Sequence, residues 1–199
     1  MNRGVTTYIS IGEWLFKIIL LNIYWFVFSL AGLFLFGLFP ATAALFATIR
    51  QELKSETDVK LFQTYWHSYK QEFLKANLLG YLIGGSAGLL LINLQILGQL
   101  EGSFIHSLFM IMTYILLAVI ALISVYILPI YVHYQFSLIG YIKYSAVMVL
   151  GKPLQTILLL LLIAATCYFY YSFPGFIPVI GTSLLAYIIM RTAYRSFAD

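Results

Sequence analysis

The sequence predicts an all-α integral membrane protein, a bundle of about five transmembrane helices with amphipathic helices at the cytoplasmic surface. Its composition carries this prediction. Of 199 residues, 62% are hydrophobic and only 9% are charged, whereas soluble domains have about 25% charged residues. The mean hydropathy is +0.95. So few charged side chains cannot cover a globule of this size, which excludes a water-soluble fold, a disordered chain and a nucleic-acid-binding module.

Five apolar segments without Asp, Glu, Lys or Arg are candidates for transmembrane helices, because a helix needs about 20 residues to cross the hydrocarbon layer. They are 18–39, 78–97, 107–134, 154–171 and 176–190. The third is longer than needed, so we expect it to tilt or to bend at Pro129. The last is short for a full crossing and follows a turn at residues 172–175. The whole chain, 1–199, is thus expected to form one membrane domain.

The positions of Lys and Arg predict which side of the membrane each connection faces. With five spans, nine of the eleven cations lie between spans one and two, between spans three and four, or after the last span. We expect that side to be cytoplasmic and to include the carboxyl end. The amino end, with Arg3 and Lys17, is then expected outside the cell membrane.

The first span has an alternative interpretation. Residues 37–40 could turn the chain, and residues 41–49 could return as a half-length re-entrant helix that puts the amino end inside. We favour the single crossing. Ala41 and Ala43 also have the spacing of a signal-peptide cleavage site, but the apolar run before them is about 22 residues, too long for a signal peptide, and is interpreted as an anchor.

Two segments between the spans, 58–75 and 136–152, are expected to be helices in the plane of the lipid headgroups. In the first, Asp58 can cap the helix, and aromatic residues recur at helical spacing opposite polar and cationic ones. The residues that define this segment are Phe62, Tyr65, Trp66, Tyr69, Lys70 and Phe73. They are expected either to anchor the bundle at the interface or to form a docking surface for a cytoplasmic partner.

Small and polar residues inside the spans are candidates for helix packing. Gly80, Gly84 and Gly88 lie on one helical face, which lets helix backbones approach closely, and a flexible gate is the functional alternative. The side-chain amides expected to form interhelical hydrogen bonds are those of Asn22, Asn93 and Gln95. Since no Asp, Glu, Lys or Arg lies deep in a span, a buried ion-coupling site is not indicated.

Patterns of catalytic and metal-binding residues are missing from the sequence. It has no His-Glu-x-x-His pair, no glycine-rich phosphate loop and no Gly-x-Ser-x-Gly elbow. Three separated histidines and a single cysteine, Cys167, do not form a structural metal site or an intrachain disulfide. We therefore expect a protein without enzymatic activity, cofactor or metal.

Four motifs stand in about the first 80 residues. They are Gly12-Glu13-Trp14, Leu21-Asn22-Ile23-Tyr24-Trp25, Gly37-Leu38-Phe39-Pro40-Ala41-Thr42-Ala43-Ala44-Leu45-Phe46-Ala47 and Phe62-x-x-Tyr65-Trp66-x-x-Tyr69-Lys70-x-x-Phe73. Together they resemble the YesL-like integral membrane proteins, a family of unknown function from Gram-positive bacteria. In the matched motifs, Pro40 would break the first span from the alanine-rich helix that follows.

Members of this family are often encoded beside binding-protein-dependent carbohydrate uptake systems and polysaccharide-degrading enzymes. The resemblance therefore implies a supporting role in oligosaccharide import, and it supplies no catalytic residues. Besides the lipid bilayer, the expected partner is a carbohydrate transporter subunit or a second copy of the chain, and no nucleic acid.

Three functions stay open at the level of the sequence. The first is a non-enzymatic accessory or regulatory component of carbohydrate uptake. The second is a small permease or facilitator for a neutral solute, with a polar passage lined by Asn22, Tyr24, Ser29, Thr42, Asn93 and Gln95. The third is a membrane enzyme, which would need a cluster of titrating groups in a cleft.

Overall fold

The computed structural model describes residues 3–55, 59–99 and 104–197, and every regular element in these ranges is helical. The helices are α1 (Arg3–Ala31), α2 (Leu38–Lys54), α3 (Leu61–Leu97), α4 (Phe104–His133), α5 (Leu138–Gly151), α6 (Pro153–Ser172), the short 3-10 helix η1 (Pro174–Phe176) and α7 (Ile177–Phe197). Five segments are long and apolar enough to cross a membrane: Ser10–Ala31, Leu61–Leu97, Phe104–His133, Pro153–Ser172 and Pro174–Phe197. The predicted all-helical class with five candidate spans is confirmed.

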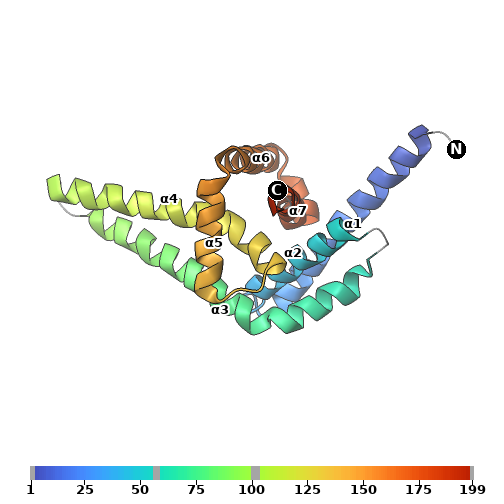
Figure 1. Ribbon diagram of the computed structural model, residues 1–199, viewed down its shortest axis with the longest axis horizontal. Coiled ribbons are helices and arrows are strands. Elements are labelled where there is room, and N and C mark those ends of the chain that lie inside the picture. Colours follow the sequence, from blue (N-terminus) through green and yellow to red (C-terminus); the bar gives the residue numbers. More distant parts are fainter. Residues whose placement is uncertain (1–2, 56–58, 100–103, 198–199) are drawn as a thin grey trace.

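Figure 1 shows how the helices are arranged. The second half of α3 and the first half of α4 project together to one side, while the start of α1 projects to the other. The view is nearly along α6, whereas α1 and α4 lie across it, so the helices do not all run parallel. In the most apolar stretches of α3 and α4, only 6% of residues are buried inside the protein. Such exposed apolar helices need lipid around them.

The expected single crossing over 18–39 is not what the structure has. Helix α1 ends at Ala31, the chain turns, and α2 begins at Leu38. Trp25 donates to the Thr42 hydroxyl, and Lys17 forms an ion pair with Glu52. Because early residues of α1 meet late residues of α2, the two helices form an antiparallel hairpin. The turn-and-return alternative therefore describes this region, although the turn precedes Pro40 rather than including it.

Two glycines make the turn between α1 and α2 possible. A Cβ atom on Gly32 would lie 2.3 Å from the Gly37 Cα, and one on Gly37 would lie 2.4 Å from the Ser29 carbonyl oxygen. Between them, Leu33 and Phe34 have φ angles of 56° and 59°, in the left-handed region that side chains disfavour. Because Gly32 and Gly37 have no side chains, the backbone can form this tight turn even though two of its apolar residues are in a disfavoured conformation.

The segments 58–75 and 78–97 are not separate elements but one continuous helix, α3, of 37 residues. At 1.5 Å per residue it is about 55 Å long, much longer than the hydrocarbon layer of about 30 Å. Figure 1 shows α3 bending near its middle rather than breaking. The Asn77 amide donates to the Phe73 carbonyl one turn earlier, a contact that competes with the backbone ladder where helices bend. Asp58, the expected cap, lies outside the described residues.

The remaining helices begin and end within about three residues of the expected positions, except for the end of α7. Helix α4 contains Pro129, as expected for the long third span. The segment 136–152 contains α5, whose first turn is capped by the Ser137 hydroxyl accepting from the Gly140 amide. Helix α7 continues seven residues beyond the expected Met190, to Phe197.

Candidate functional site

Side chains of α3 cover the polar backbone of the turn between α1 and α2. The Tyr69 hydroxyl donates to the Phe28 carbonyl at 3.1 Å, and the Asn77 amide donates to the Phe36 carbonyl at 2.9 Å. Tyr81 donates to the Leu35 carbonyl. The turn itself is apolar and exposed. Since lipid offers no hydrogen bonds, these contacts give three carbonyls in and beside the irregular turn a partner that the hydrocarbon region would not supply.

The aromatic segment of α3 is divided between two faces. Tyr65 is fully buried and donates to the Ala41 carbonyl, and Tyr69 is also buried, so both pack against the hairpin of α1 and α2. Phe62 and Trp66 remain 53% and 39% exposed. The Lys70 ammonium lies 4.0 Å from the centre of the Trp66 ring. We call the outward residues Phe62, Trp66 and Lys70 the α3 outer face.

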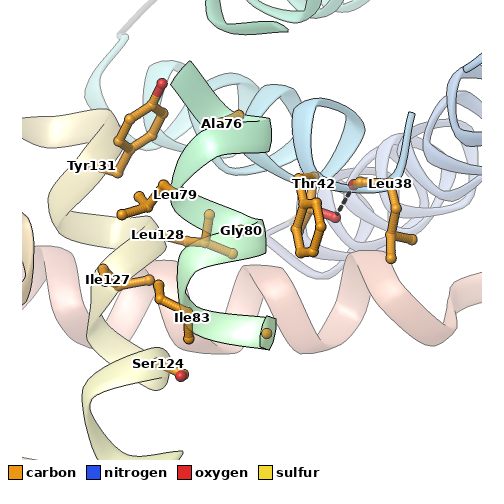
Figure 2. A pocket seen from close by; sticks show the side chains of 12 residues that line it. Leu38, Thr42, Ala76, Leu79, Gly80, Ile83, Ser124, Ile127, Leu128 and Tyr131 are labelled. Atoms are coloured by element: carbon orange, nitrogen blue, oxygen red, sulfur yellow. Dashed lines mark hydrogen bonds between the residues drawn. The ribbon is translucent and has the colours of Figure 1, made fainter. Parts of the chain in front are cut away.

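An apolar cavity of about 330 Å³ lies between α2, α3 and α4. Figure 2 shows its lining side chains, with Tyr131 at one end and Ser124 near the other. The Tyr131 hydroxyl is directed away from the rest of the lining. The twelve lining residues are Leu38, Phe39, Thr42, Ala76, Leu79, Gly80, Ile83, Gly84, Ser124, Ile127, Leu128 and Tyr131. The Thr42 hydroxyl donates to the Leu38 carbonyl, so this polar group is satisfied within α2.

A second, polar hollow of about 370 Å³ lies at the end of α4, between α2, α3 and the start of α5. It is lined by Ala47, Arg50, Ser68, Gln71, Glu72, Lys75, Tyr131, Val132, His133, Tyr134, Gln135, Phe136 and Tyr141. We call it the polar hollow. Arg50 donates through Nε to the His133 Nδ1 at 3.2 Å, and Tyr131 donates to the Glu72 carboxylate. In the part of the chain that the structure describes, neither Arg50 nor Lys75 has a carboxylate partner.

The polar side chains proposed to line a solute passage lie in separate contacts. Asn22 bonds the backbone of α7, and Thr42 accepts from Trp25. Asn93 accepts from the Thr113 hydroxyl of α4 at 3.1 Å, whereas Gln95 is exposed. Of the six proposed residues, only Thr42 lines the apolar cavity. The structure therefore does not bring them together.

Residues singled out for packing have different surroundings. Pro40 is fully buried in the first turn of α2. A Cβ atom on Gly80 would lie 2.2 Å from the Phe39 ring, so this glycine accommodates a side chain of α2 rather than a helix backbone. Gly84 lies at the cavity, and nothing surrounds the Cβ position of Gly88 within 4 Å.

The polar hollow is a site that the sequence does not predict. Ser68, Gln71, Glu72 and Lys75 are spaced as one face of a helix, which is a signal for the contribution of α3. Nothing in the linear sequence indicates that Arg50 of α2 meets them. Among the described residues 3–55, 59–99 and 104–197, no three His, Cys, Asp or Glu side chains are grouped so that they could hold a metal ion.

Known proteins are similar to this chain over most of its length and of theirs. Residues 18–94 match the family described as "Protein of unknown function, DUF624". Three uncharacterised proteins of Bacillus subtilis (strain 168) are similar. YesV is 36% identical over 99% of this chain and 95% of its own length, YteU is 33% identical over 92% and 81%, and YesL is 26% identical over 92% and 86%. No solved structure matches.

Proposed function

Because the chain belongs to the YesL-like family of multi-helix membrane proteins, described as DUF624, we propose that it is a non-enzymatic accessory component of carbohydrate uptake. In this proposal it binds a subunit of an oligosaccharide transporter at the cytoplasmic surface. The proposed role in carbohydrate uptake rests on the family resemblance, because members are often encoded beside carbohydrate uptake systems. The observation that carries the docking role is the α3 outer face.

The α3 outer face has the properties of a binding surface. Two of its side chains are large aromatic groups, and aromatic residues are enriched where binding energy concentrates. The contact between the Lys70 ammonium and the Trp66 ring orders both side chains before a partner arrives. Their neighbours Tyr65 and Tyr69 are bonded to the backbone of the hairpin, which holds this part of α3 in place. A rigid, exposed aromatic and cationic surface therefore remains.

The test compares oligosaccharide uptake in a strain that lacks the protein with uptake after complementation. We expect the parent chain to restore uptake and the double variant Trp66→Ala, Lys70→Glu to restore much less, because the ring and its cation are lost together. Tyr168→Ala removes an aromatic side chain that is 72% exposed on α6 and serves as the matched control. The amount of each chain in the membrane is measured in parallel.

A photo-crosslinking residue at position 66 identifies what the face touches. Crosslinks to a transporter subunit, lost when the residue stands at position 168, are the expected result. Unchanged uptake in the strain without the protein would contradict the proposal, as would crosslinks from position 66 to lipid alone.

A further inference from the structure

The apolar cavity and the polar hollow meet at one residue. Tyr131 lines both: its ring lies at one end of the cavity, and its hydroxyl donates to Glu72 in the hollow. Figure 2 shows the hydroxyl turned away from the cavity lining. A polar chamber and an apolar chamber thus adjoin each other, and the Tyr131 side chain lies at their boundary.

The two chambers follow each other along the same helices. On α3, the hollow uses residues 68–75 and the cavity uses residues 76–84. On α4, the cavity uses residues 124–131 and the hollow begins at Tyr131. Under the topology expected from the cations, the hollow lies at the cytoplasmic headgroup level and the cavity lies deeper. This order, polar at the surface and apolar below, is the order of a lipid molecule.

The hollow has an excess of positive charge. Arg50 and Lys75 line it together with one carboxylate, Glu72, which already accepts a hydrogen bond from Tyr131. Because Arg50 donates to the His133 Nδ1, the neutral ring keeps its Nε2–H as a further donor. A guanidinium, an ammonium and neutral donors around a small volume are suited to a phosphate group. Basic pockets between helices at the cytoplasmic surface are a known form of lipid headgroup site.

We propose that the two chambers form one binding site for an anionic phospholipid. Its phosphate group binds between Arg50 and Lys75 in the hollow, and one acyl chain occupies the apolar cavity past Tyr131. Both volumes lie within the range of small-molecule sites. This inference goes beyond the proposed docking function and does not depend on it, since the α3 outer face contributes no residue to either chamber.

The test measures how much phosphatidylglycerol stays bound to the purified full-length chain, taken from nanodiscs of phosphatidylcholine with a minority of phosphatidylglycerol and analysed by native mass spectrometry. Lys75→Gln is expected to lower retention about fivefold, the effect of one cation near an anionic headgroup. Lys75 is exposed, so the substitution does not disturb packing. Lys143→Gln, on an exposed part of α5 outside the hollow, is the matched control.

A second pair of variants tests the apolar chamber. Gly84 lines the cavity, and a Cβ atom there would have only an ordinary contact, 3.8 Å from the Phe39 ring. Gly84→Leu is therefore expected to obstruct the cavity and lower retention at least as much as Lys75→Gln. Gly88→Leu adds the same side chain one turn away, where nothing lies within 4 Å of the Cβ position, and is expected to leave retention unchanged.

Inorganic phosphate, added to the chain in a neutral detergent, separates a lipid from a free phosphoryl compound. Loss of phospholipid retention in both Lys75→Gln and Gly84→Leu, with both controls like the parent, supports the proposal. Retention unchanged in either variant overturns it. Phosphate binding that depends on Lys75, together with lipid retention unaffected by Gly84→Leu, also overturns it and assigns the hollow to a free phosphoryl ligand.

Discussion

The side-chain amide of Asn22 joins α1 to α7 by three hydrogen bonds. The Asn22 Nδ2 donates to the Pro178 carbonyl at 2.8 Å, and its Oδ1 accepts from the amides of Thr182 and Ser183 at 3.1 and 3.2 Å. Pro178 and Thr182 are four residues apart, so the amide bonds both groups that a helical backbone bond would join. Asn22 is only 4% exposed, and water cannot replace it.

We predict that Asn22→Leu lowers the free energy of unfolding by about 1–3 kcal/mol, because buried backbone groups of α7 lose their partner. Unfolding in mixed detergent micelles, followed by circular dichroism, measures the change. Asn93→Leu is the matched control, since Asn93 is exposed and has one hydrogen bond to Thr113. Its expected cost is about 0.6 kcal/mol, the average for such bonds in membrane proteins. Equal losses in the two variants would contradict the role given to Asn22.

The element that most affects the architecture is the turn between α1 and α2. It consists of apolar residues, and the side chains of Tyr81 and Asn77 satisfy two of its carbonyl groups. This turn makes two antiparallel helices out of what a hydropathy pattern presents as one long apolar run. The first half of α1 then lies beside the end of α2, where Lys17 forms an ion pair with Glu52.

We expect Gly37→Ala to destabilise the protein by about 1–3 kcal/mol, the cost of overpacking, because its Cβ atom would lie 2.4 Å from the Ser29 carbonyl oxygen. Gly37 has φ −90°, so alanine tolerates the backbone angle and the effect is purely steric. Gly88→Ala, with open space around the Cβ position, should be neutral or slightly stabilising. The same unfolding assay compares them, and a Gly37→Ala variant as stable as Gly88→Ala would refute the tight turn.

The helical class and the number of candidate spans follow from composition and hydropathy, because apolar length alone determines them. The break at residues 32–37 does not, since Leu33 and Phe34 are ordinary span residues and the contacts of Tyr69, Asn77 and Tyr81 that hold the turn come from a distant helix. The continuity of α3 does not follow from the sequence either, because its change from amphipathic to apolar is the pattern of two separate elements.

The candidate sites, too, could be predicted from the sequence only in part. Helical spacing on α3 located the aromatic segment, but not which of its rings face inward. The polar hollow depends on Arg50, Lys75 and His133, which come from three helices and meet only in the folded chain. No pattern along the sequence contains that information.

At the scale of the whole molecule, the hairpin changes the expected position of the amino end. The pairing of Lys17 with Glu52 puts the start of α1 beside the end of α2, at the side assigned to the cytoplasm. Arg3 and Lys17 would then join the other nine cations on one side of the membrane. The hairpin therefore predicts a cytoplasmic amino end, whereas a single crossing predicts one outside.

The most direct test of this membrane architecture is cysteine labelling in intact cells with a membrane-impermeant maleimide, in a Cys167→Ser background. Single cysteines are placed at Gln99, just after the end of α3, at Lys60, just before its start, and at Ser10 in α1. Lys60 and Ser10 are on the side where the Lys and Arg residues are expected to gather. We predict that Q99C is labelled in intact cells, whereas K60C and S10C are labelled only after the membrane is permeabilised. Labelling of K60C in intact cells would contradict the account.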